Sequence, residues 1–207
     1  MRTGRTASAV AILLALAAGH VITTRTDLGE SDPSFVTSGS LGEPVHLVYG
    51  DVEVTDVRPA QYVVPQNTTE LARLAGGVFV LVSVQVLPTR EPTSFLAAYL
   101  VDEQGRQFRA SHRSECAQSV DGQTGLPAYA LFCFDVPSSV LAGLHHQIGR
   151  GDLLYSTLQG DELADVDLQI SSADARSWAR TRAAYLAEST DDQPIVLQSV
   201  DLQQAPS

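Results

Sequence analysis

Cys116 and Cys133 are the two cysteines of the chain, and their chemistry depends on the compartment in which the chain folds. They lack the Cys-x-x-Cys spacing of redox centres, and disulfides persist outside the cytoplasm. We therefore expect a structural disulfide between them, which in the chain-entropy description stabilises a loop of about 17 residues by roughly 3 kcal/mol. Free buried thiols are one alternative, and a redox or metal-binding role is another.

Two histidines, His145 and His146, are adjacent in the sequence. Neighbouring side chains on a β-strand point to opposite faces, so the two imidazoles cannot easily bind one metal ion. We expect neither a metal ion nor a cofactor at this pair.

An acidic cluster comprises Asp161, Glu162, Asp165 and Asp167. Asp165 and Asp167 would lie on one face of a strand, where two carboxylates could hold a hard cation such as Ca²⁺. The spacing matches no calcium-binding loop. We favour a solvated strand edge whose charges discourage pairing with another strand.

No catalytic motif stands out in the sequence. The Gly-x-Ser-x-Gly, His-Glu-x-x-His and Ser-x-x-Lys patterns and the glycine-rich phosphate loop are absent. The chain contains no lysine, which excludes Schiff-base lysines and lysine general bases. We expect a protein that is not an enzyme.

The composition limits the class of protein and its partners. Hydrophobic residues make up 44% and charged residues 18% of the 207 residues, a balance typical of a globular domain. The 13 basic residues, all arginine, face 24 acidic residues, which gives a net charge of −11. Because nucleic-acid binding depends on Lys and Arg neutralising phosphates, we expect no nucleic-acid partner. The arginine-only usage is typical of a high-GC bacterium.

The first 24 residues resemble an export signal. Arg2 and Arg5 precede an uncharged, largely apolar run over residues 7–22. As a helix this run would reach about 24 Å, short of the roughly 30 Å hydrocarbon core of a bilayer. We favour a retained single-pass signal anchor, and cleavage of a signal peptide with secretion is the alternative. Both place the rest of the chain outside the cytoplasm, after a flexible stalk at 25–41.

Residues 42–171 show the alternation of apolar and polar residues that predicts β-strands. In the clearest segment, 77–86, five valines share one face, as in a strand that faces a sandwich core. We expect a turn at Gly50-Asp51 and a hairpin formed by 94–101 and 106–110. Other strands are expected at 129–136, 144–149, 165–170 and 195–202. Seven to eight strands without intervening helices predict a mainly β fold, an immunoglobulin-like antiparallel β-sandwich.

A C-terminal helix is expected at 172–188, and residues 172–207 should pack on the sandwich. Ser171 or Ser172 can cap the helix, with Asp174 in its first turn. Trp178, the only tryptophan, should pin the helix to the sandwich. The alternative is an interaction helix, with a docking surface formed by Trp178, Arg176, Arg180 and Arg182.

Several short motifs in residues 41–170 resemble those of the secreted immunoglobulin-like domains common in actinobacteria. They are Leu41-Gly-Glu-Pro-Val45, Val52-Glu-Val54, Gly77-Val-Phe-Val80, Leu100-Val-Asp102 with Gly105-Arg106, and Phe134-Asp-Val-Pro137. This family of unknown function is similar to the immunogenic secreted mycobacterial antigens. The resemblance implies an immunoglobulin-like fold and supplies no catalytic residues, and the predicted C-terminal helix departs from the minimal domain.

These observations favour a membrane-tethered binding or interaction domain that recognises another protein of the cell envelope. A carrier of a small ligand or ion in the envelope is a second hypothesis. A structural component of the envelope is a third.

Overall fold

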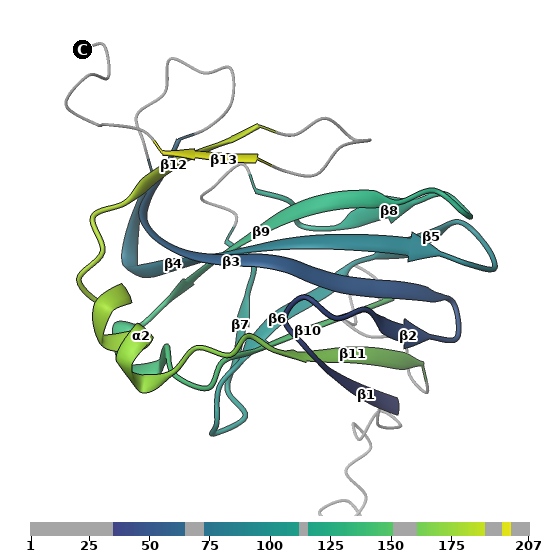
Figure 1. The fold of residues 1–207 in the computed structure, drawn as a ribbon, viewed down its shortest axis with the longest axis horizontal. Coiled ribbons are helices and arrows are strands. Elements are labelled where there is room, and N and C mark those ends of the chain that lie inside the picture. The colour runs from purple at the N-terminus through teal and green to yellow at the C-terminus, as the bar shows by residue number, and fades with distance from the viewer. Residues whose placement is uncertain (1–34, 65–72, 112–115, 151–160, 189–195, 200–207) are drawn as a thin grey trace, which may run out of the picture. The chain divides into compact units, whose positions relative to one another are not determined.

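The computed structural model describes residues 35–64, 73–111, 116–150, 161–188 and 196–199. Two β-sheets face each other and form a β-sandwich (Figure 1). Within these residues no helix is long and apolar enough to cross a membrane. The predicted export segment, 7–22, lies outside the described residues.

One layer is a five-stranded sheet in the order β1-β11-β10-β6-β7. Its strands are β1 (Phe35–Ser40), β6 (Ala97–Val101), β7 (Gln107–Arg109), β10 (His145–Gly149) and β11 (Glu162–Asp167). The pairs β11–β10, β10–β6 and β6–β7 are antiparallel, whereas β1 runs parallel to β11. β1 and β7 are therefore the two edges of this sheet.

The other layer is a six-stranded sheet in the order β13-β12-β3-β4-β9, with β2 paired to the start of β3. Its strands are β2 (Val45–Leu47), β3 (Gly50–Val64), β4 (Arg73–Pro88), β9 (Ala128–Val136), β12 (Ala184–Glu188) and β13 (Val196–Ser199). A two-stranded ribbon, β5 (Thr93–Phe95) with β8 (Val120–Gly122), completes the strands described.

The main core lies between the two large sheets. The valines predicted to share one face of β4 are all buried there: Val78, Val80, Val82, Val84 and Val86. Phe132 and Phe134 of β9 lie beside them, and Leu100, Ile148 and Val166 contribute from the five-stranded sheet. The alternating pattern of 77–86 is thus confirmed as the core face of a central strand.

A second, smaller apolar cluster covers the opposite face of the same strands, and we call it the outer cluster. It contains Phe79 and Leu81 of β4, Leu131 and Cys133 of β9, and Ala60, Val63 and Ala75. Cys116, Tyr185 and Leu197 pack against it. Strands β4 and β9 are therefore buried on both faces.

The prediction of a mainly β sandwich is confirmed, and its details need correction. The described residues contain thirteen strand segments, more than the seven to eight expected, because several predicted strands are divided and others carry few apolar residues. The sheets are mixed, since β1–β11 and β12–β3 are parallel pairs. The hairpin of β6 and β7 is confirmed, whereas the β2–β3 turn lies at Val48-Tyr49 instead of Gly50-Asp51.

The predicted stalk at 25–41 is wrong for its last residues, because β1 spans Phe35–Ser40. Phe35, Val36 and Ser38 are exposed, and no residue of this strand is buried. The strand therefore lacks the alternation of apolar and polar residues by which a sequence reveals a half-buried strand. The strand is held by its pairing with β11. Gly39 allows Val45 to pack closely against it, because a Cβ at this position would lie 2.3 Å from Cγ2 of Val45.

The predicted helix at 172–188 is correct only in its first half. Helix α2 spans Ser172–Trp178 and begins with a capping box, in which the Ser171 hydroxyl accepts from the Asp174 backbone N–H. Residues Ala184–Glu188 instead form β12, parallel to the end of β3. Pairing with an open strand and burial of Tyr185 on the outer cluster outweigh the helical pattern there.

Candidate functional site

The predicted disulfide between Cys116 and Cys133 is confirmed. Cys133 is buried in β9, and Cys116 packs against the outer cluster beside it. Two backbone hydrogen bonds, from Ser111 N to Cys133 O (2.7 Å) and from Ala117 N to Leu131 O (2.8 Å), hold residues near Cys116 to the same strand. The bond therefore closes the free edge of β9, which is a structural role.

The predicted interaction helix is too short to carry all its named residues. Trp178 is half-buried and packs against the main core, which agrees with a pinning role. Arg176 lies on α2, whereas Arg180 and Arg182 follow its end. All three arginines are exposed, and Nη1 of Arg182 donates to the Thr181 carbonyl (3.3 Å). A docking role for these residues stays a prediction.

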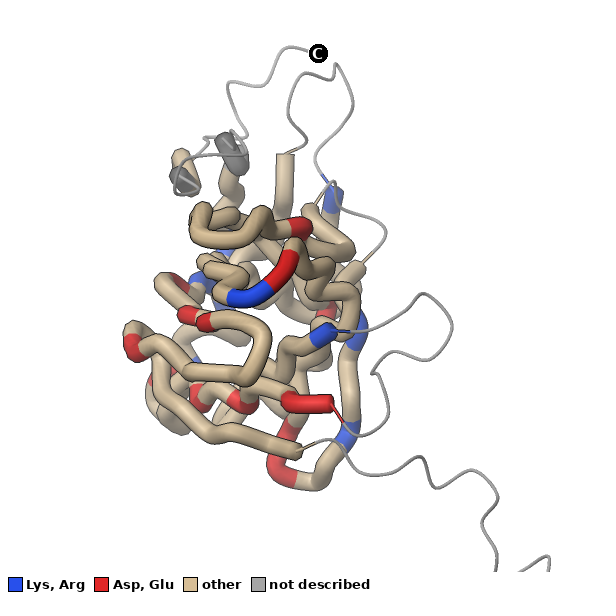
Figure 2. The backbone as a smooth tube through the Cα atoms, turned by 90° about the vertical axis from the view of Figure 1, so that its right-hand side faces the viewer, with Lys and Arg blue, Asp and Glu red and all other residues tan. Residues whose placement is uncertain are grey.

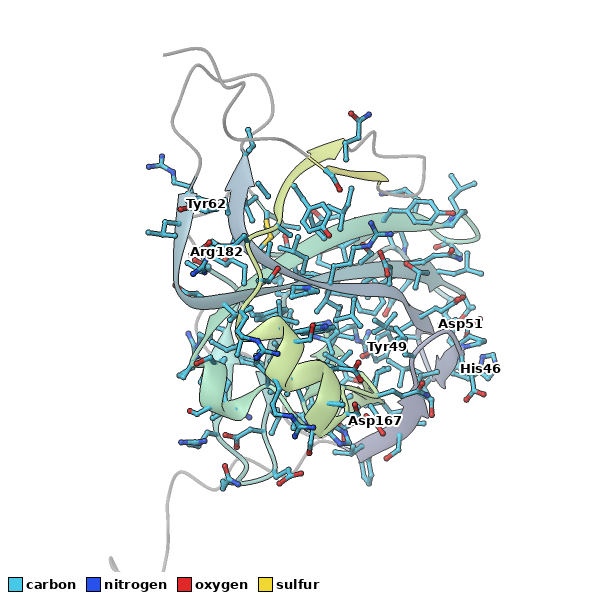
Figure 3. All side chains as sticks on the ribbon, turned by 60° about the vertical axis from the view of Figure 1, so that its left-hand side comes forward. His46, Tyr49, Asp51, Tyr62, Asp167 and Arg182 are labelled. Atoms are coloured by element: carbon cyan, nitrogen blue, oxygen red, sulfur yellow. A yellow bond between two sulfur atoms is a disulfide. The ribbon has the colours of Figure 1, made fainter. Side chains whose placement is uncertain are left out.

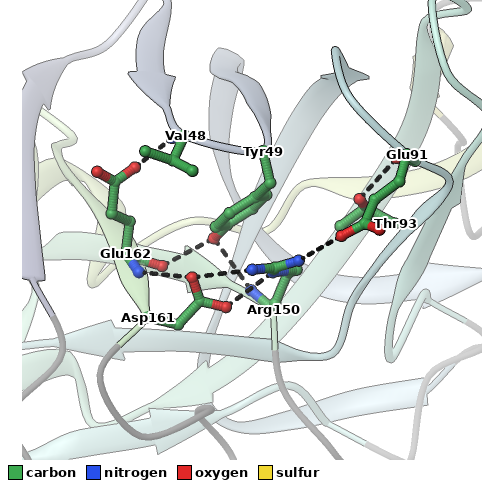
Figure 4. A network of polar contacts seen from close by, with 7 residues as sticks. All are labelled: Val48, Tyr49, Glu91, Thr93, Arg150, Asp161 and Glu162. Carbon is green, nitrogen blue, oxygen red and sulfur yellow. Dashed lines mark hydrogen bonds and ion pairs between the residues drawn. The ribbon is translucent and has the colours of Figure 1, made fainter.

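The acidic cluster is divided between two places. Asp161 and Glu162 lie at one end of the five-stranded sheet, where Asp161, Tyr49 and Glu91 converge on Arg150 (Figure 4). Asp165 and Asp167 lie further along β11, on the face turned away from the main core. The expectation that this strand forms an edge is wrong, because β1 covers β11.

Arg150 is the centre of the polar network in Figure 4. Its Nε and Nη2 donate to the two oxygens of Asp161 (2.7 and 3.2 Å), and its Nη1 donates to Glu91 (2.9 Å). The Arg150 Cζ lies 4.3 Å from the ring centroid of Tyr49. The hydrogen bond with Asp161 raises the pKa of Arg150.

Tyr49 connects this network to the β2–β3 turn. Its hydroxyl donates to the Glu162 carbonyl (2.8 Å) and accepts from the Arg150 backbone N–H (3.2 Å). The Glu162 carboxylate accepts from the Val48 backbone N–H. Burial raises the pKa of Tyr49 to about 12, so its hydroxyl stays protonated at neutral pH. The network, which we call the Arg150 clamp, joins the β2–β3 turn and Glu91 to the end of β10 and the start of β11. Its polar groups bind one another.

Nothing in the sequence marks Tyr49, Glu91 and Arg150 as parts of one network. They are far apart in the chain, and each has an ordinary interpretation by itself: a strand residue, a turn residue and a charge after a strand. They meet because the β2–β3 turn, the residues before β5 and the end of β10 lie at one end of the sandwich.

His145 and His146 point to opposite faces of β10, as predicted. His146 is fully buried between Phe132 and Phe134, and its Nδ1 lies 3.1 Å from the Tyr99 carbonyl. Burial lowers the pKa of His146 to about 4. His145 lies on the other face, with Nδ1 3.5 Å from Oδ1 of Asp165.

A further histidine, His46, also lies beside a carboxylate. His46 Nδ1 lies 2.8 Å from Oδ1 of Asp51, at the β2–β3 hairpin (Figure 3). Across the described part of the chain, no group of three or more His, Cys, Asp or Glu residues is arranged to hold a metal ion. Figure 2 shows acidic residues on several strands and turns instead of in a single patch.

The edge strand β1 offers a different kind of site, because its backbone is paired on one side. The backbone N–H groups of Phe35 and Leu41 donate to the backbone carbonyls of Asp161, just before β11, and Asp167 (2.9 and 3.0 Å). Backbone groups of successive residues alternate in direction, so those of Val36 and Ser38 point to the open side. Among the described strands β1 pairs with β11 alone.

The side chains of β1 leave this edge accessible. Phe35 and Val36 are 68% and 53% exposed. The strand contains no charge and no proline and has an unbroken register with β11, so it lacks the usual features that block pairing at a sheet edge. We take the open edge of β1, with Asp165 and Asp167 behind it, as the candidate binding site.

Comparisons with known proteins provide no family for this chain. No sequence family model matches it, and no curated protein matches it. The yjhA protein of Bacillus subtilis is similar in structure, with a TM-score of 0.47 and 12% identity over 62% of this chain and 99% of its own. An uncharacterized β-sandwich protein of Clostridium difficile 630 has a TM-score of 0.37 and 10% identity over 66% of this chain and 97% of its own. On the evidence of its own sheets and main core, the chain is a β-sandwich domain.

Proposed function

We propose that this chain is a non-enzymatic binding domain outside the cytoplasmic membrane that recognises another envelope protein through the open edge of β1. The observation that carries the proposal is the combination of backbone groups at Val36 and Ser38 that have no strand partner among the described residues with exposed apolar side chains at Phe35 and Val36. Addition of a strand from a partner to such an edge is a common mode of protein recognition.

The state of the titratable groups supports binding over catalysis. Tyr49 and His146 have strongly displaced pKa values, the property that often marks a catalytic group. Tyr49 is bound within the Arg150 clamp, and His146 is enclosed by aromatic rings of the main core. Neither group is placed to reach a substrate.

Two parts of the proposal, the location outside the cytoplasmic membrane and the protein family, rest on the sequence. Arg2, Arg5 and the apolar run at 7–22 support a membrane tether, and release by cleavage is the alternative. N-terminal sequencing of the mature protein tests this, since a new terminus within or after 7–22 would contradict the tether. Membership of the actinobacterial immunoglobulin-like family is part of the proposal, supported by motifs that lie on β3, β4, β6 and β9.

Affinity capture with the full chain from membranes of the source cell tests the binding function. Val36→Asp places a charge on the open edge, whereas Leu126→Asp places the same charge at an exposed site (61%) between β8 and β9. We expect the wild type and Leu126→Asp to recover the same partner, and Val36→Asp to recover at least about tenfold less. Equal recovery by both variants would overturn the proposal.

A further inference from the structure

We infer that the segment which pairs with β1 is an extended stretch of a partner protein with basic side chains at alternating positions. This inference rests on the proposed function and specifies the partner. It comes from the side chains that a docked strand would meet on the face of the sheet turned away from the main core.

Small residues on β1 stand in front of acidic residues on β11. Ser38 is in register with Asp165, and Ser40 with Asp167. All four side chains lie on the same face, because Ala164 and Val166, which alternate with the two aspartates along β11, point into the main core. The side chain of Asp165 is 20% exposed, and Figure 3 shows where Asp167 lies.

The spacing of strands sets the length of side chain that can reach these carboxylates. Adjacent strands are about 4.8 Å apart, so a strand docked on β1 lies roughly 10 Å from β11. A long side chain is needed to cross that distance over a serine. Arginine and lysine have the required length and charge, and the two-residue spacing of Asp165 and Asp167 calls for basic residues at positions i and i+2.

Val36 and the net charge of the chain specify the partner further. They favour an apolar residue beside the basic residues and a segment that is cationic overall. Val36, two residues before Ser38 on the same face, would contact an apolar side chain of the docked strand. The net charge of −11 favours a cationic partner at long range. A second copy of this chain would bring the same acidic pair toward Asp165 and Asp167, so self-pairing is disfavoured.

A labelled peptide probe tests the inference on the full chain. The probe Thr-Arg-Thr-Arg-Thr-Val-Thr suits antiparallel pairing, and the reversed order Thr-Val-Thr-Arg-Thr-Arg-Thr suits parallel pairing. Fluorescence anisotropy should show that at least one of these two peptides binds, and added salt should weaken this binding. The same peptide with glutamate in place of arginine should bind at least about tenfold more weakly.

Protein variants separate a specific site from general attraction to an acidic chain. The double variant Asp165→Asn/Asp167→Asn should weaken binding of the probe about fivefold. The matched control, Glu103→Gln/Asp121→Asn, removes two charges from the β6–β7 turn and β8 and should have a much smaller effect. Equal losses in the two double variants would overturn the site.

Backbone pairing is tested on both molecules. Ser38→Pro removes an N–H that points away from β11, so the domain should keep its stability while probe binding falls at least about tenfold. N-methylation of alternate probe amides should have the same effect without any change in the protein. Undiminished binding in both experiments would overturn strand addition.

The remaining outcomes distinguish this inference from the proposed function. If captured partner is lost with Val36→Asp but no arginine probe binds at millimolar concentration, the function stands and the basic partner is wrong. If the wild-type chain sediments as a dimer and Ser38→Pro as a monomer, a second copy occupies the edge and the inference is overturned. If neither partner nor probe binds, both proposals fail.

Discussion

The two faces of β4 are both buried, but they are covered in different ways. The valine face lies under a complete five-stranded sheet, which is joined by a continuous ladder of hydrogen bonds. The face of Phe79 and Leu81 is covered by Cys116 and by Tyr185 and Leu197, which lie on the paired strands β12 and β13. The main core is therefore closed by a second sheet, and the outer cluster by two smaller attachments, the disulfide-linked Cys116 and one pair of strands.

This difference predicts that the two clusters respond differently to mutation. Loss of a side chain in the main core leaves a cavity between two rigid sheets, which cannot collapse easily. Loss of an attachment over the outer cluster can be confined to that attachment, since local opening costs less than global unfolding. Substitutions in the main core and in the outer cluster test this contrast.

Phe132→Ala should lower the free energy of unfolding by about 4 kcal/mol, because Phe132 is fully buried between the sheets. Urea denaturation followed by circular dichroism measures the change. Phe35→Ala, at an exposed position, is the control and should change stability by less than about 0.5 kcal/mol. A loss below about 1.5 kcal/mol for Phe132→Ala would contradict a rigidly closed main core.

The buried His146 makes the stability of the main core depend on pH. Its folded-state pKa of about 4 lies below the ordinary value of 6.5, so the unfolded chain takes up a proton more readily between these values. The stability that the neutral His146 contributes to the folded state is present in full above pH 6.5 and is lost as the pH falls toward 4. The loss attributable to this group should reach about 3 kcal/mol.

His146→Phe provides the matched measurement, because it places a neutral ring between Phe132 and Phe134. The difference in unfolding free energy between wild type and variant should change in the variant's favour as pH falls from 6.5 to 4. A difference that is constant over this range would show that His146 does not titrate on unfolding.

Cys116→Ala/Cys133→Ala should lower the free energy of unfolding by roughly 3 kcal/mol, since the disulfide closes a 17-residue loop. Hydrogen exchange should show faster opening along the edge of β9, with little change at the valines of β4. Uniform acceleration of exchange through both clusters would mean that the outer cluster and the main core open together.

Tyr185→Ala should cost about 1.5 kcal/mol, less than the loss of a fully buried ring, because Tyr185 is only half-buried on the outer cluster. Thermal unfolding gives the global effect. Limited proteolysis near β12 gives the local effect. Cleavage there should become faster by more than the change in global stability alone would produce. A cost equal to that of Phe132→Ala would remove the distinction between the two clusters.

Part of the fold could be predicted because it is written in short-range patterns. The period-two valines of β4, the turn between β6 and β7 and the pairing of two lone cysteines all follow from adjacent residues or from a count. The capping of α2 by Ser171 is equally local. The end of α2 was not predictable in this way, because β12 forms only when β3 is present to pair with it.

The candidate site was less accessible to sequence reasoning. Asp165 and Asp167 were identified as a pair on one face, but their position behind an edge strand depends on β1, whose exposed residues carry no apolar pattern. The Arg150 clamp depends on loops that are far apart in the chain. Such arrangements are set by long-range pairing, which no single segment encodes.

Residue types and local periodicity are enough to predict the β class of the domain, the core face of β4 and the disulfide, and the lack of lysine excludes lysine chemistry. The tertiary structure alone decided that 35–40 is an edge strand, that β11 lies behind it, and that a second apolar cluster covers β4 and β9. The physical reason is that a strand's hydrogen bonds are satisfied by its neighbours in space. Which edge is left open is therefore known only when every strand has been placed.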